Sequence, residues 1–237
     1  MMDAFNHLDM KGPDPLGECR ELMRAAGVDR SVVVETGAGD NRAVLDGIVE
    51  RRDPGLPVIY MYRGKPVRPV VEREGVIGLR AGGKLLEGEP GWLGDLAQSG
   101  RWLLPHADPG IGALTRQLGR IRAKYPRLKI YVPHIGWPVR GGAMDPDWPA
   151  AMETLGRMGV TLGVSALTAF SKAPFPHDEL RRMTLPALRH FRPGQLVAAT
   201  DYPYVEKARY ADYLALVCQW IRDVHPSWSD DNALSIG

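Results

Sequence analysis

Histidine and aspartate side chains stand at the ends of short apolar runs in several parts of the sequence. His7, His106 and His134 each end or follow such a run, and Asp201 follows another near the C-terminus. Neutral imidazoles and a carboxylate are ligands for zinc, manganese or iron. A bound divalent ion would lower the pKa of its water toward neutrality, and an aspartate beside that water could move its proton. The four side chains therefore indicate a hydrolytic site, provided that the fold brings them together.

Arginines occur in the same kind of position. Arg63 and Arg80 follow apolar runs, and Arg140 lies a few residues beyond His134. The planar guanidinium group matches a carboxylate in two parallel hydrogen bonds. We expect these three arginines to bind a carboxylate of a small-molecule substrate.

Three more side chains are candidates for the wall of the pocket. Ser165 ends an apolar run, Trp137 follows His134 closely, and Tyr202 follows Asp201. We expect all three to contact substrate, although packing in the core is an equally good interpretation for the two aromatic residues.

The elements that must position these residues recur along the whole chain. Eight apolar runs are expected to be strands: Met2–Leu8, Ser31–Thr36, Val58–Tyr62, Gly75–Leu79, Trp102–Pro105, Lys129–Pro133, Thr161–Ala166 and Leu196–Thr200. Helical patterns separate them at Leu16–Ala26, Arg42–Arg52, Val67–Glu74, Pro90–Gln98, Ile111–Lys124, Trp148–Met158, Asp178–His190 and Ala208–Val224. The third of these is the weakest and is expected to be a single turn.

Strands that alternate with helices imply a parallel sheet, and eight of them form a (β/α)₈ TIM barrel. An open, doubly wound sheet is the alternative, because periodicity alone does not show that a sheet closes. In a barrel the carboxyl ends of the strands share one rim, which would bring the candidate residues together.

Size and composition fit one domain over residues 1–237. The chain has 237 residues, close to the roughly 250 of a typical barrel. Its formal net charge of +2 gives no reason to expect nucleic acid or a membrane surface as a partner. The N-terminal residues resemble no secretory leader, so the cytoplasm is the expected location. Many barrels pair, and a homo-oligomer is compatible with the sequence.

Several motifs resemble the amidohydrolase superfamily, in the branch of 2-pyrone-4,6-dicarboxylate hydrolase-like lactonases and the aminocarboxymuconate-semialdehyde decarboxylase type. The similar segments are Ala26–Val34, Gly75–Arg80, Leu104–His106, Pro133–Pro138, Ala199–Pro203 and Asp231–Leu234. Their order and spacing cover nearly the whole chain. The resemblance implies a barrel with His106, His134 and the strand-eight carboxylate Asp201 in its active site.

The first strand departs from the family pattern. The family carries Asp-Ala-His-x-His there, and both histidines bind metal, whereas Asp3-Ala4-Phe5-Asn6-His7 places a phenylalanine at the first of them. His7, His106 and Asp201 remain as ligands for zinc or manganese. Three ligands can make an open catalytic zinc site, but a metal-free mechanism is the alternative, because the family includes members that hydrolyse activated lactones without metal.

Three hypotheses for function follow. The first is a hydrolase of a cyclic ester or amide of a small carboxylated compound, with Asp201 as general base and acid and the histidines as metal or oxyanion site. The second is a decarboxylase, hydratase or dehydratase on the same scaffold. The third is a metal-free cyclase-like or non-catalytic member, supported mainly by Phe5.

Overall fold

The computed structural model describes residues 1–37, 40–64, 66–107 and 110–229. Eight parallel strands lie side by side in the order β1-β2-β3-β4-β5-β6-β9-β10. They span Met2–Asn6 (β1), Arg30–Val34 (β2), Val58–Met61 (β3), Val76–Gly82 (β4), Trp102–His106 (β5), Lys129–Val132 (β6), Thr161–Val164 (β9) and Leu196–Ala198 (β10). A short antiparallel hairpin joins β7 (Val139–Arg140) to β8 (Ala143–Met144).

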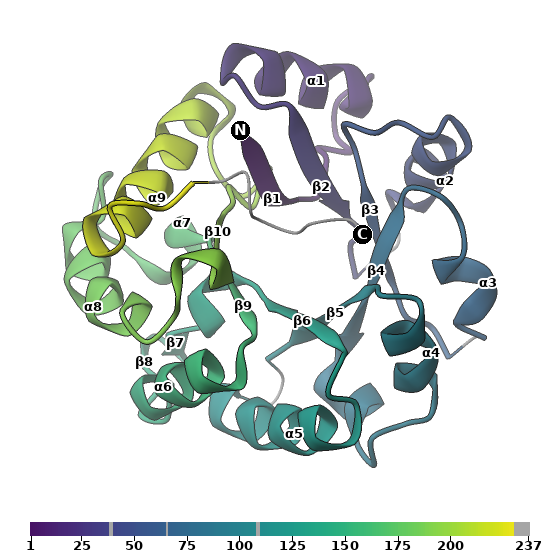
Figure 1. Ribbon diagram of the computed structural model, residues 1–237. Helices are drawn as coiled ribbons and strands as arrows, with labels where there is room; N and C mark the ends of the chain where they lie inside the picture. The colour runs from purple at the N-terminus through teal and green to yellow at the C-terminus, as the bar shows by residue number, and fades with distance from the viewer. Residues whose placement is uncertain (38–39, 65, 108–109, 230–237) are drawn as a thin grey trace.

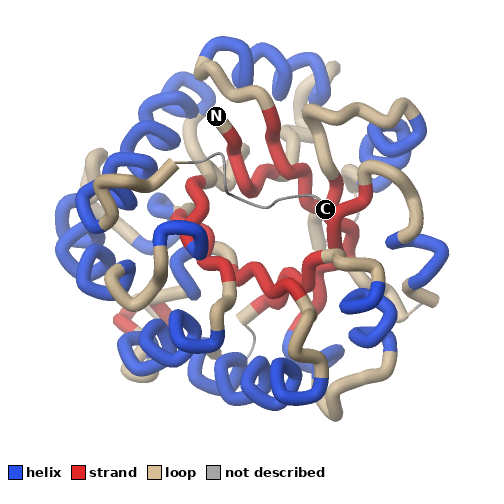
Figure 2. The backbone as a smooth tube through the Cα atoms, in the orientation of Figure 1, coloured by secondary structure: helices blue, strands red, loops and turns tan. Residues whose placement is uncertain are grey.

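Helices surround the strands on all sides (Figures 1 and 2). They span Pro15–Ala25 (α1), Arg42–Glu50 (α2), Arg68–Val71 (α3), Trp92–Gln98 (α4), Ile111–Lys124 (α5), Trp148–Met158 (α6), Leu167–Phe170 (α7), Asp178–Leu188 (α8) and Tyr210–Val224 (α9). Short 3₁₀ turns lie at Gly83–Leu86, His134–Gly136, Pro193–Gln195 and Lys207–Arg209. The weak third helix is confirmed as a single turn, α3.

Backbone hydrogen bonds between β1 and the segment after β10 close the sheet. The amide of Asp201 donates to the carbonyl of Phe5 at 3.0 Å, and the amide of His7 donates to the carbonyl of Tyr202 at 2.8 Å. The expected (β/α)₈ barrel is therefore confirmed, and the open sheet is not observed. Closure also places Asp201 directly beside the first strand.

Strand boundaries differ most from the prediction at β4. The strand was expected to end at Leu79 but continues to Gly82, because its pairing with β5 extends to Gly82 opposite His106. Arg80 therefore lies inside the strand rather than after it. Its side chain points into the barrel, whereas that of Leu79 joins the outer core layer.

Apolar side chains form two layers on either side of the strands. The barrel interior is filled by residues including Val34, Ile59, Leu104 and Tyr131, and a larger layer packs between the strands and the helices. Tyr131 occupies space above Gly163, where a Cβ atom would lie 2.5 Å from the tyrosine oxygen. The packed interior closes the lower barrel, so a cavity can open only toward a rim.

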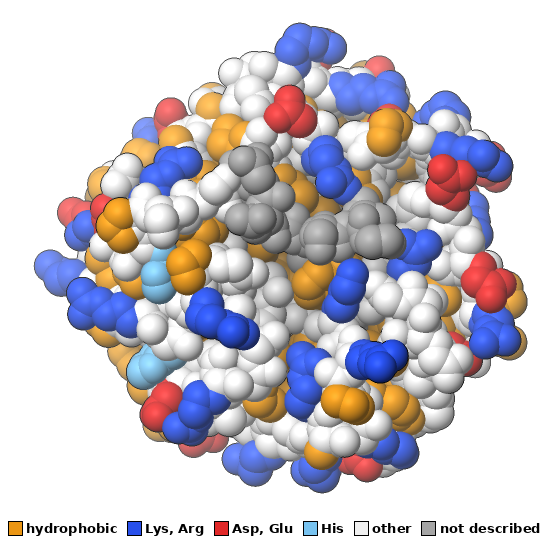
Figure 3. Space-filling view, in the orientation of Figure 1, with side chains coloured by type: hydrophobic (Ala, Val, Ile, Leu, Met, Phe, Trp, Pro, Cys, Tyr) orange, Lys and Arg blue, Asp and Glu red, His pale blue; other side chains and the backbone are white. Residues whose placement is uncertain are grey.

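The outer surface is polar and mixed in charge. Figure 3 shows lysine and arginine side chains distributed around the helices on the visible face, with acidic side chains between them. Among the described residues, the helices are too short or too polar for a membrane span. The Asp231–Leu234 motif lies outside the described residues.

Candidate active site

The candidate catalytic residues meet in a cavity of ≈ 310 Å³ inside the rim of the barrel. We call it the inner cavity. Its polar wall consists of His7, Arg80, His106, His134 and Asp201, and its remaining wall of Thr36, Gly37, Trp137, Ala166, Ala169, Phe170 and Tyr204. The four histidine and aspartate side chains come from the residue after β1, from β5, from the turn after β6 and from the segment after β10. The structure thus brings together residues almost 200 positions apart in sequence.

Asp201 occupies a backbone conformation that L-residues seldom adopt. Its φ is +66°, in the left-handed region, which costs of order 1 kcal/mol for a non-glycine residue. Such strain persists where surrounding contacts fix it, and it is frequent at active sites. The left-handed turn aims the Asp201 carboxylate into the inner cavity, while the following residue, Tyr202, points outward.

The Asp201 carboxylate is buried and incompletely bonded. Oδ1 has no hydrogen-bond partner among the described residues, and it lies 3.9 Å from Nε2 of His7. Oδ2 lies 3.9 Å from Nδ1 of His134. Burial raises the pKa of Asp201 well above its ordinary value, the charge of Arg80 opposes that rise, and the charge of Asp3 adds to it. A buried carboxylate with a raised pKa, facing a cavity, is a candidate for proton transfer to and from a ligand.

His7 presents a lone pair to the cavity. Its Nδ1 lies 2.8 Å from the carbonyl oxygen of Val34, which can only accept, so Nδ1 carries the proton and Nε2 does not. Burial lowers the pKa of His7 to about 4, partly opposed by this hydrogen bond. The imidazole is therefore neutral at physiological pH. Asn41 holds the same segment by donating to the carbonyl of His7 at 2.9 Å.

His134 is fixed by Ser165. The serine hydroxyl accepts the backbone amide of His134 at 3.2 Å and lies 3.0 Å from Nδ1 of its ring. Burial lowers the pKa of His134 well below its ordinary value, and the charge of Arg80 lowers it further. Ser165 is fully buried and absent from the cavity wall, so the structure places it behind His134 rather than against a substrate.

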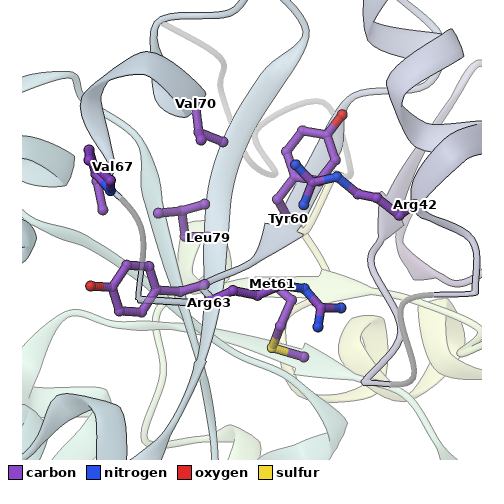
Figure 4. A pocket seen from close by; sticks show the side chains of 9 residues that line it. Arg42, Tyr60, Met61, Arg63, Val67, Val70 and Leu79 are labelled. Carbon is purple, nitrogen blue, oxygen red and sulfur yellow. The ribbon is translucent and has the colours of Figure 1, made fainter.

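Arg63 lies outside the inner cavity, because the buried Glu35 holds it elsewhere. Arg63 Nη2 lies 2.8 Å from Glu35 Oε1, and Arg42 Nη1 lies 3.0 Å from Glu35 Oε2. Both arginines line a second cavity of ≈ 260 Å³ with Tyr60, Met61, Tyr62, Pro66, Val67, Val70 and Leu79, which we call the outer cavity (Figure 4). In it the Arg42 guanidinium lies 4.0 Å from the centre of the Tyr60 ring.

Two other candidates for substrate contact also point elsewhere. Arg140 is exposed on β7, in the small hairpin that the sequence pattern did not predict. Tyr202 is buried in the outer core layer, where its hydroxyl donates to Glu18. The left-handed turn at Asp201 explains its position, because the two neighbouring side chains face opposite ways there. Of the aromatic candidates, Trp137 lines the cavity as expected, with its ring centre 5.3 Å from that of His134.

Sequence reasoning missed the apolar wall of the cavity. Ala169 and Phe170 belong to α7, a four-residue helix too short for a periodic pattern, and Tyr204 follows the β10 turn. No motif singles out these residues. Their contribution depends on a loop conformation that periodicity does not encode.

The donor atoms do not make a three-ligand metal centre. His7 Nε2 and Asp201 Oδ1 face each other across 3.9 Å, and both are suitable donors. The Phe5 ring packs edge-on against His7 and His134, with ring centres 4.8 and 4.5 Å away, and offers no donor atom. The part of the chain that the structure describes holds no group of three His, Cys, Asp or Glu side chains disposed around one point. The described residues therefore do not fit the family's metal site.

Comparison with known families agrees with the fold. The amidohydrolase family model matches residues 6–229, so the chain belongs to the amidohydrolase family. No curated protein sequence matches the chain at a significant level.

Solved structures share the fold at low identity. A probable 2-pyrone-4,6-dicarboxylic acid hydrolase from Acinetobacter baumannii, with citric acid bound, has a TM-score of 0.73 and 17% identity, over 98% of this chain and 96% of that one. A Pseudomonas putida protein assigned the same activity has a TM-score of 0.70 and 20% identity, over 94% and 93%. A zinc-bound amidohydrolase from Burkholderia multivorans has a TM-score of 0.65 and 16% identity, over 98% and 93%.

Decarboxylases are found on the same scaffold. A 2,6-dihydroxybenzoate decarboxylase from Rhizobium and a manganese-bound dihydroxybenzoic acid decarboxylase from Polaromonas have TM-scores of 0.60 and 0.59. At 13% and 12% identity they establish the fold alone. Family membership thus supports an enzyme, while both hydrolases and decarboxylases occur among its structural relatives.

Proposed function

We propose that the protein is a hydrolase that opens a cyclic ester or amide of a small carboxylated compound. The observation that carries the proposal is the Asp201 carboxylate, which is buried at the cavity wall with one oxygen that no described residue hydrogen-bonds. A general base must have an acceptor atom available to a water molecule, and its pKa should lie near the working pH. Asp201 lines the cavity with about 8% of its side chain exposed, and its Oδ1 has no partner among the described residues. Burial raises its pKa above the ordinary aspartate value.

Arg80 supplies the positive charge of the site. It lines the cavity from β4, and Coulombic attraction couples it to Asp201. Burial lowers the pKa of Arg80, but a guanidinium starts so high that it stays charged. Its fork can hold a substrate carboxylate, or the carbonyl oxygen on which negative charge develops. An aromatic or conjugated ring would then lie against Trp137 and Phe170.

His134 can donate a hydrogen bond to the substrate. The Ser165 hydroxyl accepts the His134 amide and can donate its own hydrogen to Nδ1, which leaves the ring proton on Nε2. A neutral imidazole of this tautomer is a donor for a carbonyl or oxyanion. His7 offers the opposite character, an accepting Nε2, and can orient the attacking water. His106 completes the polar wall beside Trp137.

Ring opening can be written with these residues alone. Asp201, as a carboxylate, takes a proton from water, and the water oxygen bonds to the lactone carbonyl carbon. Arg80 and His134 stabilise the charge on the former carbonyl oxygen. The bond from this carbon to the ring oxygen then breaks, and the ring oxygen receives the proton from Asp201. One lactone and one water become one hydroxy acid, and Asp201 returns to its carboxylate form.

A panel of carboxylated lactones, beginning with 2-pyrone-4,6-dicarboxylate, tests this function. The wild-type protein should open at least one of them, and Asp201→Asn should lower kcat by about 10²- to 10⁴-fold. Asp212→Asn makes the same chemical change on an exposed position of α9 and should leave kcat unchanged. Full activity of Asp201→Asn would refute the assignment of the base.

Decarboxylation is the second candidate, and one observation favours it. Because burial raises the pKa of Asp201, a protonated Asp201 could deliver a proton to carbon as carbon dioxide leaves. The apolar wall of Trp137 and Phe170 would destabilise the charged carboxylate of a substrate and so favour its loss as neutral carbon dioxide. Release of carbon dioxide from a dihydroxybenzoate, in place of ring opening, would select this reaction over hydrolysis.

A further inference from the structure

The carboxylate of Asp3 lies behind the inner cavity, at the seam where β1 meets β10. Asp3 is fully buried, and each of its oxygens accepts two hydrogen bonds. Oδ1 accepts the amides of Phe5 at 3.3 Å and Thr200 at 3.0 Å. Oδ2 accepts the hydroxyls of Thr200 at 2.7 Å and Tyr210 at 2.8 Å. Asp3 is thereby fixed by neighbours from its own strand, from the end of β10 and from α9.

The proton positions in this cluster follow from its geometry. The Thr200 hydroxyl oxygen accepts the amide of Tyr202 at 3.1 Å, which leaves the hydroxyl hydrogen for Asp3. A proton on either oxygen of Asp3 would displace one of its four donors. The hydrogen bonds therefore favour the charged carboxylate, although burial raises the pKa of Asp3.

Asp3 and Thr200 control the turn that contains Asp201. The Thr200 amide is held by Asp3 Oδ1, and the Asp201 amide by the carbonyl of Phe5. The Tyr202 amide is held by the Thr200 hydroxyl, whose direction Asp3 sets in turn. Three consecutive amides are thus fixed around a residue with φ of +66°. Removal of these bonds would let the turn relax toward a less strained conformation.

We propose that Asp3 is a positioning residue for Asp201, acting through Thr200 to hold the turn that aims the catalytic carboxylate into the inner cavity. The inference rests on the proposed function for the catalytic role of Asp201, but the hydrogen bonds that hold the turn stand independently of it. Asp3 does not touch substrate, because its four acceptor positions are occupied and it is fully buried.

Thr200→Val tests the proposal without changing Asp3 or the shape of the side chain. Loss of the hydroxyl removes the acceptor for the Tyr202 amide, so hydrogen exchange of that amide, measured by NMR, should accelerate at least about tenfold. Misplacement of Asp201 should lower kcat by about 10- to 100-fold with KM within about threefold. Thr200→Ser keeps the hydroxyl and should restore both values. Asp3→Asn places a side-chain amide group against the two hydroxyl donors, Thr200 and Tyr210, and should lower kcat in the same way.

Tyr210→Phe is the matched control. It removes one donor to Asp3 but leaves the contacts of Thr200, so the unfolding temperature should fall while kcat and the exchange of the Tyr202 amide stay within about threefold. Unchanged amide exchange in Thr200→Val would overturn the proposal, as would faster exchange with full kcat. If the wild type opens no lactone, the proposed function fails, and the exchange measurements alone still decide whether Thr200 holds the turn.

Discussion

A buried carboxylate lies at each of the two cavities, but among the described residues only the one at the outer cavity is hydrogen-bonded to arginines. Behind the wall of the outer cavity, Glu35 is fully buried and accepts hydrogen bonds from Arg42, Arg63 and the Met61 amide. In the inner cavity, Asp201 is also buried, yet Oδ1 has no protein partner within the described residues. Both cavities lie near the same rim, on either side of the strands.

This difference in hydrogen bonding distinguishes a carboxylate that stabilises the fold from one that can act on a ligand. A buried carboxylate that is satisfied by two guanidinium groups has little left to offer a ligand, and its loss should cost stability. A buried carboxylate without a partner destabilises the free protein but can bind a ligand. Its replacement should therefore lower activity rather than stability. Position at a strand end does not distinguish the two cases, since Glu35 and Asp201 both follow strands.

The largest expected difference between the two cavities comes from replacing one arginine in each of them. Arg80→Met removes the charge that faces the substrate and should lower kcat/KM by about 10²- to 10³-fold, with little loss of stability. Arg63→Met in the outer cavity should leave kcat/KM within about threefold, because Arg63 is bound to Glu35. Steady-state kinetics of the two variants check this, and equal losses would remove the distinction between the cavities.

Glu35→Gln should produce the converse result. The change leaves Arg42 and Arg63 without their shared buried counter-charge and should lower the free energy of unfolding by about 3 kcal/mol. Glu153→Gln, in an exposed pair with Arg157, should cost less than about 0.5 kcal/mol. Urea titration measures both. A Glu35→Gln variant with native stability but poor kcat would place Glu35 in the catalytic machinery instead.

Phe5→His addresses the metal directly. A third donor beside His7 and Asp201 should raise zinc affinity at least about tenfold over the wild type, measured by calorimetry after dialysis against chelator. Phe5→Leu removes the ring without adding a donor and should show no such gain. Tight stoichiometric zinc binding by the wild type would show that the side chains rearrange around a metal.

The pH profile should follow Asp201 rather than His7. The base acts in its deprotonated form, so kcat/KM should fall as pH decreases through the pKa of Asp201, which burial raises above its ordinary value. Below that pKa, kcat/KM should fall by nearly tenfold for each pH unit. His7, with a pKa lowered to about 4, stays neutral over that range and adds no second step. An acidic limb at the ordinary aspartate pKa would show that Asp201 is not shielded as the structure indicates.

The sequence predicted the barrel, and it predicted that four polar side chains would meet at one rim, because both follow from periodicity. Apolar runs mark the strands, and His7, His106, His134 and Asp201 stand where the runs end. Arg63 was indistinguishable from Arg80 on this basis, since only packing shows that Glu35 pairs with one of them. In the same way, only the left-handed turn at residue 201 reveals that the next side chain points away from the cavity.

The apolar wall of the inner cavity and the β7–β8 hairpin depend on loop geometry. Phe170 lies on a single helical turn, and β7 and β8 have two residues each, so neither produces a periodic signal. Ser165 could be recognised as a polar strand-end residue but not as the partner of His134, because its bond crosses between neighbouring strands. Long-range contacts of this kind form only when the barrel closes, so local sequence patterns do not predict them.

The most direct test of the account is ring opening by chelator-treated protein, with 2-pyrone-4,6-dicarboxylate as the first substrate and Asp201→Asn alongside. The account predicts that treated wild-type protein keeps the full rate and that the variant loses about 10²-fold or more. A rate that disappears on chelation and returns with zinc or manganese, or a variant as active as the wild type, would contradict it.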